Sequence, residues 1–160
     1  MENDFILYDM QTRYFARLSS RSPILIVGRD RKFDIPLPLY EGRQRAGSLS
    51  EICADTARVL NVNESSPELR RLVKSISLDH ASIVRKNDGF YITDRDSNGT
   101  AIHPEGRISI PLKPDVETKL NLDDKIFFGY WEVLFSTPQR VSDTGLKIAG
   151  EYKLADEKAA

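Results

Sequence analysis

Three short polar segments hold the side chains best suited to bind an anion. Gly28-Arg29 follows an apolar run, Ser77 opens the sequence Ser-Leu-Asp-His, and Ser97-Asn98-Gly99 lies further along the chain. A guanidinium matches a phosphate because it donates paired hydrogen bonds in a fixed fork. Taken singly, an arginine after a strand is usually a solvated charge and Asn-Gly is usually a turn. If the fold brings the three segments together, however, they form a small cationic pocket rich in hydroxyl and amide groups.

The same region contains residue types used in hydrolysis. Ser77, Asp79 and His80 are the types of a hydrolase triad, and Cys53 is a potential nucleophile. Triad members normally come from distant segments, and three of them within one short stretch do not readily adopt that geometry. Cys53 falls on the apolar face of an expected helix, where cysteine is more often a packing residue. We therefore expect a protein that is not an enzyme and has no cofactor and no metal site.

The composition restricts the class of protein further. Hydrophobic residues make up 40% of the chain and charged residues 29%, and 23 basic and 24 acidic residues leave a net charge of −1. This balance argues against bulk binding of nucleic acid. The single cysteine excludes an intrachain disulfide framework. No segment approaches the roughly 18 apolar residues of a membrane span, and the acidic N-terminus does not resemble a secretory signal. We expect no membrane insertion and a cytoplasmic location, or a nuclear one if the source is eukaryotic.

Short strands separated by turn residues predict an all-β domain. Alternating, β-branched and aromatic residues indicate strands near 5–8, 14–18, 24–27, 33–37, 81–85, 90–93, 100–103, 108–110, 125–128 and 130–135. Asn87-Asp88-Gly89 predicts a hairpin turn, and Gly129 marks another tight reversal. This pattern is typical of an antiparallel β-sandwich of two sheets.

Residues 48–74 depart from the strand pattern and predict a short two-helix insertion. Ser48 and Glu51 form a capping box before a one-sided apolar spacing that ends at Asn61. Ser66-Pro67 predicts the start of a second helix. We expect a β-sandwich domain over residues 1–136, with the whole insertion at about 41–74. A polar C-terminal tail over 137–160 is expected to be disordered or weakly helical.

The order of these motifs resembles the forkhead-associated (FHA) domain family. The matching segments are Gly28-Arg29, Ser77-Leu-Asp-His80-Ala81, Asp88-Gly89-Phe90, Ser97-Asn98-Gly99-Thr100, and Leu122, Asp124, Ile126 and Gly129. The resemblance runs from about Ile24 to Phe135. It implies a sandwich that binds phosphothreonine peptides through loops at one end and so mediates phosphorylation-dependent protein–protein interaction in signalling.

The resemblance also implies individual roles. Arg29 would bind the phosphate, and Ser77 would donate its hydroxyl to the same group. Ser97 stands where the family usually has threonine, beside the phosphothreonine methyl group and phosphate, and Asn98 would bind the peptide backbone. The residues expected to support the binding loops are Gly28, His80 and Gly99.

The sequence departs from the family pattern in two places. Leu78 stands where the family usually has a basic or polar residue that helps to hold the phosphate. Losing a charge-assisted hydrogen bond of about 1.5–3 kcal/mol would weaken binding at least tenfold. The connection from Arg29 to Ser77, normally short, carries the helical insertion. One basic residue of this connection could replace the missing donor: Arg31, Lys32, Arg43, Arg45, Arg70, Arg71 or Lys74. The alternative is that the insertion covers the pocket or binds something itself.

A second hypothesis follows from these departures. An FHA-fold interaction or dimerisation domain with reduced or lost phosphate dependence would use the insertion as its interface. The helices would then present apolar side chains to a partner or to a second copy: Leu49, Ile52, Leu60, Leu69 or Leu72. The simpler alternative is that these residues pack against the sandwich, as apolar helix stripes usually do. The sequence does not specify the oligomeric state or the sequence of the phosphorylated partner.

Overall fold

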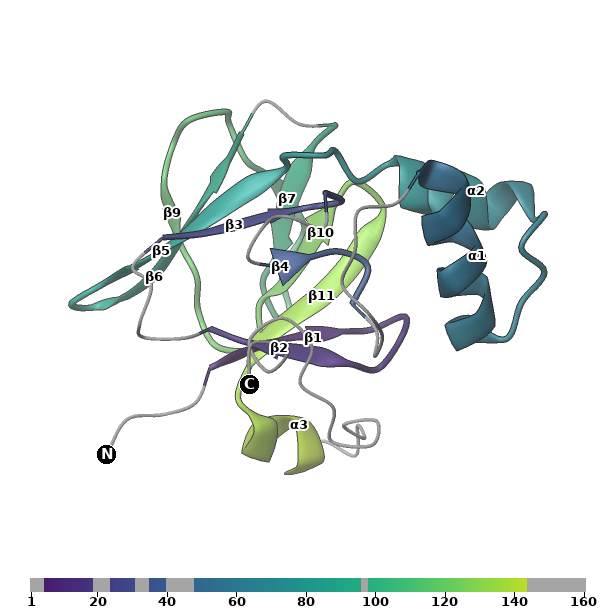
Figure 1. Ribbon diagram of the computed structural model, residues 1–160. Coiled ribbons are helices and arrows are strands. Elements are labelled where there is room, and N and C mark those ends of the chain that lie inside the picture. The colour runs from purple at the N-terminus through teal and green to yellow at the C-terminus, as the bar shows by residue number, and fades with distance from the viewer. Residues whose placement is uncertain (1–4, 19–23, 31–34, 40–47, 96–97, 144–160) are drawn as a thin grey trace.

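Buried and partly exposed side chains alternate along several strands, which gives each strand an inward and an outward face. Burial follows this alternation along β6 (Gly89–Asp94) and β10 (Lys125–Phe128). The computed structural model describes residues 5–18, 24–30, 35–39, 48–95 and 98–143. Their strands form two sheets (Figure 1), which confirms the predicted β-sandwich.

The first sheet has six strands, all paired antiparallel. In spatial order they are β2 (Phe15–Arg17), β1 (Ile6–Asp9), β11 (Trp131–Ser136), β10, β7 (Thr100–His103) and β8 (Ile110–Pro111). The second sheet has five strands. They are β4 (Ile35–Pro36), β3 (Ile24–Gly28), β5 (Ala81–Lys86), β6 and β9 (Thr118–Lys119). The β3–β4 pair is parallel, and the other pairs of this sheet are antiparallel.

The main core lies between the sheets. Trp131 and Phe128 from the first sheet are fully buried with Val27, Ile83 and Ile92 from the second. Burial of an apolar side chain of this size contributes about 1.5–3 kcal/mol. The loops at the ends of the strands are therefore carried by a rigid scaffold.

The two-helix insertion is present. Helix α1 (Leu49–Leu60) begins with the predicted capping box of Ser48 and Glu51, and Asn61 closes it in the left-handed conformation at φ 58°. Helix α2 (Pro67–Lys74) begins at the N-cap Ser66. Figure 1 shows the two helices side by side at the end of the sandwich where β3 ends.

The apolar faces of the helices are packed. Ile52 and Leu69 lie in a small apolar cluster between α1 and α2. Leu60 contacts both this cluster and the main core, and Leu72 contacts the main core. Leu49 is partly buried against the small cluster. These side chains are thus used within the chain, so the structure does not favour the hypothesis of an interface built from them.

Residues after β11 continue the fold. Helix α3 (Pro138–Asp143) places Val141 in a buried cluster with Ile6, Tyr8 and Phe15. The start of the predicted polar tail therefore packs on the β1–β2 hairpin, and the candidate helix within 146–158 lies outside the described residues.

Two details of the strand prediction differ from the structure. Strand β9 was not predicted, because two residues are too short for an alternating pattern. The strand expected at 108–110 is β8 at Ile110–Pro111, with Ile108 83% exposed. None of the helices in the described ranges combines the length and hydrophobicity that a bilayer crossing requires.

Candidate functional site

The first polar segment lies against the second because β3 ends in a glycine. A Cβ atom on Gly28 would lie 2.1 Å from the carbonyl oxygen of Leu78, so another residue would force these backbones apart. The Arg29 N–H donates to the Ser77 carbonyl at 2.9 Å, and the His80 N–H donates to Val27 at 2.9 Å. Main-chain bonds therefore hold Arg29 beside Ser77.

The side chain of Arg29 turns along this loop. Its Nε donates to the carbonyl oxygen of Ile76 at 2.9 Å, and the residue is half-buried. Within the described ranges the two terminal nitrogens of the guanidinium have no hydrogen-bond partner. They provide the paired donors that a phosphate oxygen pair accepts.

The third polar segment meets the second directly. The Asn98 N–H donates to the Ser77 hydroxyl oxygen at 2.9 Å. The Asn98 Nδ2 donates to the carbonyl oxygen of Ser75 at 3.2 Å and, at 3.4 Å, to that of Lys74. Because the Ser77 hydroxyl accepts from Asn98, its own hydrogen is left to donate to a ligand. Asn98 is exposed and clamps the loop that precedes Ser77.

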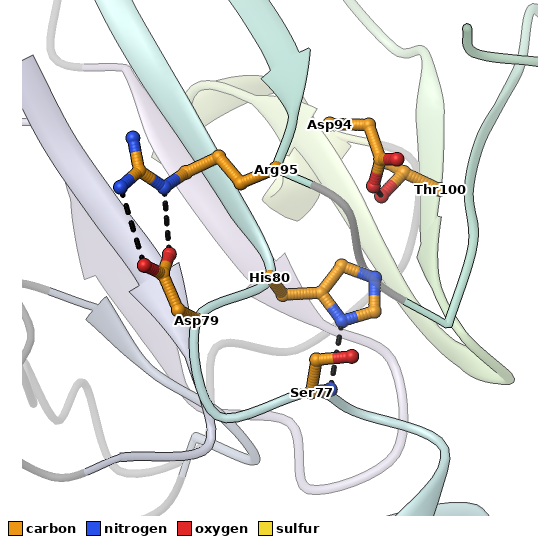
Figure 2. A network of polar contacts seen from close by, with 6 residues as sticks. All are labelled: Ser77, Asp79, His80, Asp94, Arg95 and Thr100. Carbon is orange, nitrogen blue, oxygen red and sulfur yellow. Dashed lines mark hydrogen bonds and ion pairs between the residues drawn. The ribbon is translucent and has the colours of Figure 1, made fainter. Parts of the chain in front are cut away.

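His80 joins the Ser77 loop to the Gly99 loop. Figure 2 shows the ring bonded to Ser77. The Ser77 N–H donates to Nδ1 at 2.9 Å, so Nε2 carries the ring hydrogen and donates to the Gly99 carbonyl at 2.8 Å. The ring is fully buried and meets Phe128 edge-on at 5.5 Å between centroids. Burial lowers the pKa of His80, which keeps this two-sided bridge neutral.

Two further polar pairs flank His80, and neither was predicted from the sequence. Arg95 donates to Asp79 through Nε at 2.7 Å and Nη2 at 3.2 Å. Thr100 donates its hydroxyl to Asp94 at 2.7 Å in a buried position. Figure 2 shows both pairs beside the histidine. For the second pair, the signal in the sequence was an aspartate at the end of β6 and a threonine at the start of β7.

The geometry does not form a hydrolase triad. Ser77 bonds to His80 through its backbone N–H and not through its hydroxyl. Asp79 pairs with Arg95, so it does not orient the imidazole. Cys53 is buried between the inserted helices, and burial raises the pKa of its thiol. In the described ranges no cluster of three His, Cys, Asp or Glu side chains is placed to hold a metal ion.

The structure brings Arg29, Ser77 and Asn98 to one place, and Gly28, His80 and Gly99 lie directly behind them. Ser97 lies outside the described residues, as do Arg31, Lys32, Arg43 and Arg45. Leu78 is 55% exposed beside the site, and its backbone carbonyl accepts a hydrogen bond from the Asp30 N–H at 3.3 Å.

The fold and the motif order agree with comparisons to known proteins. Residues 25–129 match the model of the FHA domain family. No curated protein gives a significant match to the sequence.

Three solved structures illustrate the structural similarity. Mycobacterium tuberculosis EmbR in complex with a low-affinity phosphopeptide has a TM-score of 0.53 and 18% identity, and the match covers 86% of this chain. The FHA domain of human APLF in complex with an XRCC1 bisphospho peptide has a TM-score of 0.53 and 14% identity over 84% of this chain. The N-terminal FHA domain of S. cerevisiae Rad53p in complex with a phosphothreonine peptide has a TM-score of 0.52 and 12% identity over 88% of this chain.

The lengths of these relatives differ. The match spans 25% of the EmbR chain and 98% of each of the other two. At identities below 20% the structural likeness concerns the fold, while the family model covers most of this sequence, including the β3 and β5 ends that form the site. The chain belongs to the FHA domain family.

Proposed function

We propose that this chain is a non-catalytic module that binds phosphothreonine peptides and thereby makes protein–protein association depend on phosphorylation. The observation that carries the proposal is the meeting of three ligand-directed groups at one surface. These are the terminal nitrogens of Arg29, the hydroxyl of Ser77 and the exposed amide of Asn98.

The chemistry of these groups suits a phosphate monoester. A phosphothreonine carries a charge of about −1.5 to −2 at pH 7 and three acceptor oxygens. Arg29 supplies the positive charge and paired N–H donors, and Ser77 supplies a hydroxyl donor. Asn98 uses Nδ2 within the chain, so its Oδ1 is left to accept a backbone N–H of a bound peptide. By the family resemblance Ser97 would contact the phosphothreonine methyl group, which remains a prediction.

The absence of a relay between Ser77, Asp79 and His80 supports binding over catalysis. The proposal uses His80 as a brace because both of its nitrogens already hold loops.

Substitution of Arg29 tests the proposal. The wild type should bind peptides from a library with a fixed phosphothreonine. It should not bind peptides from the same library with unmodified threonine at that position. Arg29→Ala should lose at least about 100-fold in affinity, since two charge-assisted hydrogen bonds amount to roughly 3 kcal/mol or more. Calorimetry with a peptide chosen from the retained pool gives the values.

Arg107→Ala is the matched control, because Arg107 is an exposed arginine in the β7–β8 connection and makes no side-chain bond within the described ranges. It should bind as the wild type does. Equal retention of phosphorylated and unmodified libraries by the wild type would show that the proposed function is wrong.

A further inference from the structure

Strand β9 leaves one edge of the second sheet open. It is the last strand in the order β4-β3-β5-β6-β9, and among the described residues it pairs with β6 alone. Figure 1 places it on the opposite side of the sandwich from α1 and α2. An open edge presents main-chain donors and acceptors that can pair with another chain. The edge strands β4 and β8 each contain a proline, which has no N–H to donate, whereas β9 contains none.

The unpaired main-chain groups of this edge belong to Glu117 and Lys119. The Leu120 N–H donates to the Phe90 carbonyl at 2.8 Å, while Lys119 lies opposite Tyr91. Hydrogen-bonded and non-hydrogen-bonded pairs alternate along an antiparallel ladder, so the N–H and the carbonyl of Lys119 face away from β6. The same alternation turns the carbonyl of Glu117 outward. Among the described residues, the main-chain groups of Glu117 and Lys119 have no hydrogen-bond partner.

The open segment ends at a turn on either side. Asp115 has a left-handed backbone at φ 65°, and its N–H donates to the Asp94 carbonyl at 3.1 Å. The Asn121 N–H donates to the Asp124 carboxylate at 2.9 Å. The main-chain groups that an added strand can use are therefore confined to residues 117–119.

The charges of this segment complement those of a second copy. If two β9 strands pair antiparallel about Thr118, each Glu117 lies opposite the partner's Lys119. Opposite charges directly across an antiparallel pair stabilise it. Both side chains are exposed. Within the chain they form surface pairs, Glu117 with Lys86 at 2.5 Å and Lys119 with Asp88 at 3.7 Å, so the added charge pairs extend an alternating row of charges.

The apolar side chains of the same segment also match. Val116 is 49% exposed, whereas Leu120 is buried at the edge of the core. In the pairing about Thr118, Val116 comes opposite the partner's Leu120. The exposed apolar side chain at one end of the segment is thereby covered by the second copy. A twofold contact repeats this arrangement at the other end.

We propose that β9 is the contact of a homodimer, in which two copies of this chain pair their residues 117–119 antiparallel about a twofold axis at Thr118. The contact is formed by main-chain hydrogen bonds at Glu117 and Lys119, by the charge pairs between these residues, and by Val116. It is smaller than the interface of a stable complex, so the dimer is weak and forms at high local concentration. It uses none of the residues of the candidate site and does not depend on the proposed function.

Sedimentation of the full chain at increasing concentration tests for the dimer. We expect a reversible monomer–dimer equilibrium with a dissociation constant of about 0.1–1 mM, as suits a small interface. In ¹⁵N spectra, the amide signals of Glu117 and Lys119 should shift with concentration because their N–H groups become hydrogen-bonded. The amide signal of Ser109, an exposed residue next to the β8 edge, should stay in place.

Charge reversal identifies the contact. Glu117→Lys and Lys119→Glu each place like charges opposite one another and should each weaken self-association at least about fivefold. A mixture of the two variants restores opposite charges in both pairs, so it should associate as well as the wild type does. Glu105→Lys and Arg107→Glu are the matched controls, because both residues are exposed in the β7–β8 connection. Both controls should associate as the wild type does, and thermal midpoints check that each variant is folded.

Three results would overturn the dimer. The first is a wild type that remains monomeric at every concentration. The second is self-association that neither charge reversal weakens. The third is a mixture of the two reversed variants that associates no better than either variant alone. Each of these results leaves the proposed phosphothreonine binding untouched, because that binding is measured with peptides on the monomer.

Discussion

Two fully buried titratable side chains, Asp9 in the first sheet and His80 beside the second, serve different parts of the molecule. The Asp9 carboxylate accepts from Gln11 and Thr12 within its own hairpin, and from the Leu39 N–H at 2.8 Å and Trp131 Nε1 at 2.7 Å. Among the described residues, the His80 ring bonds to the loops of Ser77 and Gly99. Asp9 therefore joins distant segments of the scaffold, whereas His80 sets the positions of the groups that we propose bind the ligand.

Burial alone therefore does not identify a functional residue. Both side chains are buried and fully hydrogen-bonded, yet only the partners of His80 lead to the surface at which Arg29 and Asn98 meet. A change at Asp9 should affect stability without changing the affinity of the folded protein, and a change at His80 should affect both.

The largest expected effect is on stability at Asp9. Asp9→Ala leaves the Leu39 N–H and the Trp131 indole N–H buried without acceptors, which should cost about 3 kcal/mol or more. Urea unfolding followed by the fluorescence of Trp131, the single tryptophan, measures this loss.

Glu117→Ala is the control for Asp9, because Glu117 belongs to an exposed pair with Lys86 and should change stability by less than about 1 kcal/mol. Peptide affinity of Asp9→Ala, measured where the variant is folded, should equal that of the wild type. A loss of affinity without loss of stability would reverse the roles that we assign to the two side chains.

The next effect concerns His80. His80→Ala leaves the Ser77 N–H without its acceptor and removes the ring donor to the Gly99 carbonyl, which still accepts the Gly129 N–H at 2.8 Å. We expect a stability loss of about 2 kcal/mol and at least a tenfold loss of phosphopeptide affinity, because both ligand loops lose their brace. Calorimetry measures the loss of affinity, and urea unfolding of the same sample measures the loss of stability. Unchanged affinity would mean that His80 supports the core and not the site.

The smallest effect is a difference in pH dependence. Burial raises the pKa of Asp9 to about 7, although four donated hydrogen bonds lower it. The native state therefore binds more protons than the unfolded state between about pH 4 and 7, and stability falls as the pH rises through this window. Between pH 6 and 8 the expected fall is on the order of 1 kcal/mol.

His80 acts in the opposite direction. Its pKa is lowered by burial, so the native state binds fewer protons, and its contribution is complete above the unfolded value of about 6.5 and is lost as the pH falls. Unfolding free energies of the wild type and Asp9→Asn from pH 5 to 8 test both statements. The variant should keep the acid-side loss and lose the decline above pH 6, whereas an unchanged decline would exclude Asp9 as its source.

Much of the fold could be predicted because the signals were local. The alternation along β6 and β10, the capping box of Ser48 and Glu51, and the left-handed Asn61 each depend on residues close in sequence. Strand β9 could not be predicted because its pairing with Tyr91 and Ile92 comes from the partner strand and not from its own pattern.

The site could be predicted only in part, because several of its contacts join segments that are distant in sequence. The order of the motifs was enough to select Arg29, Ser77 and Asn98 as members of one surface. The Arg95–Asp79 pair, the bond from Asn98 to Ser75 and the bond from Trp131 to Asp9 depend on how distant segments pack, and the last spans 122 residues.

We propose that Arg29, Ser77 and Asn98 together hold one phosphothreonine, and a chemical-shift titration tests this directly. A ¹⁵N-labelled sample titrated with a phosphothreonine peptide should show its largest shifts at the Arg29 side-chain Nε–H and at the backbone amides of Ser77 and Asn98. The unphosphorylated peptide should leave these signals in place. Shifts that are equal for both peptides, or that arise elsewhere while these three signals stay fixed, would contradict the claim.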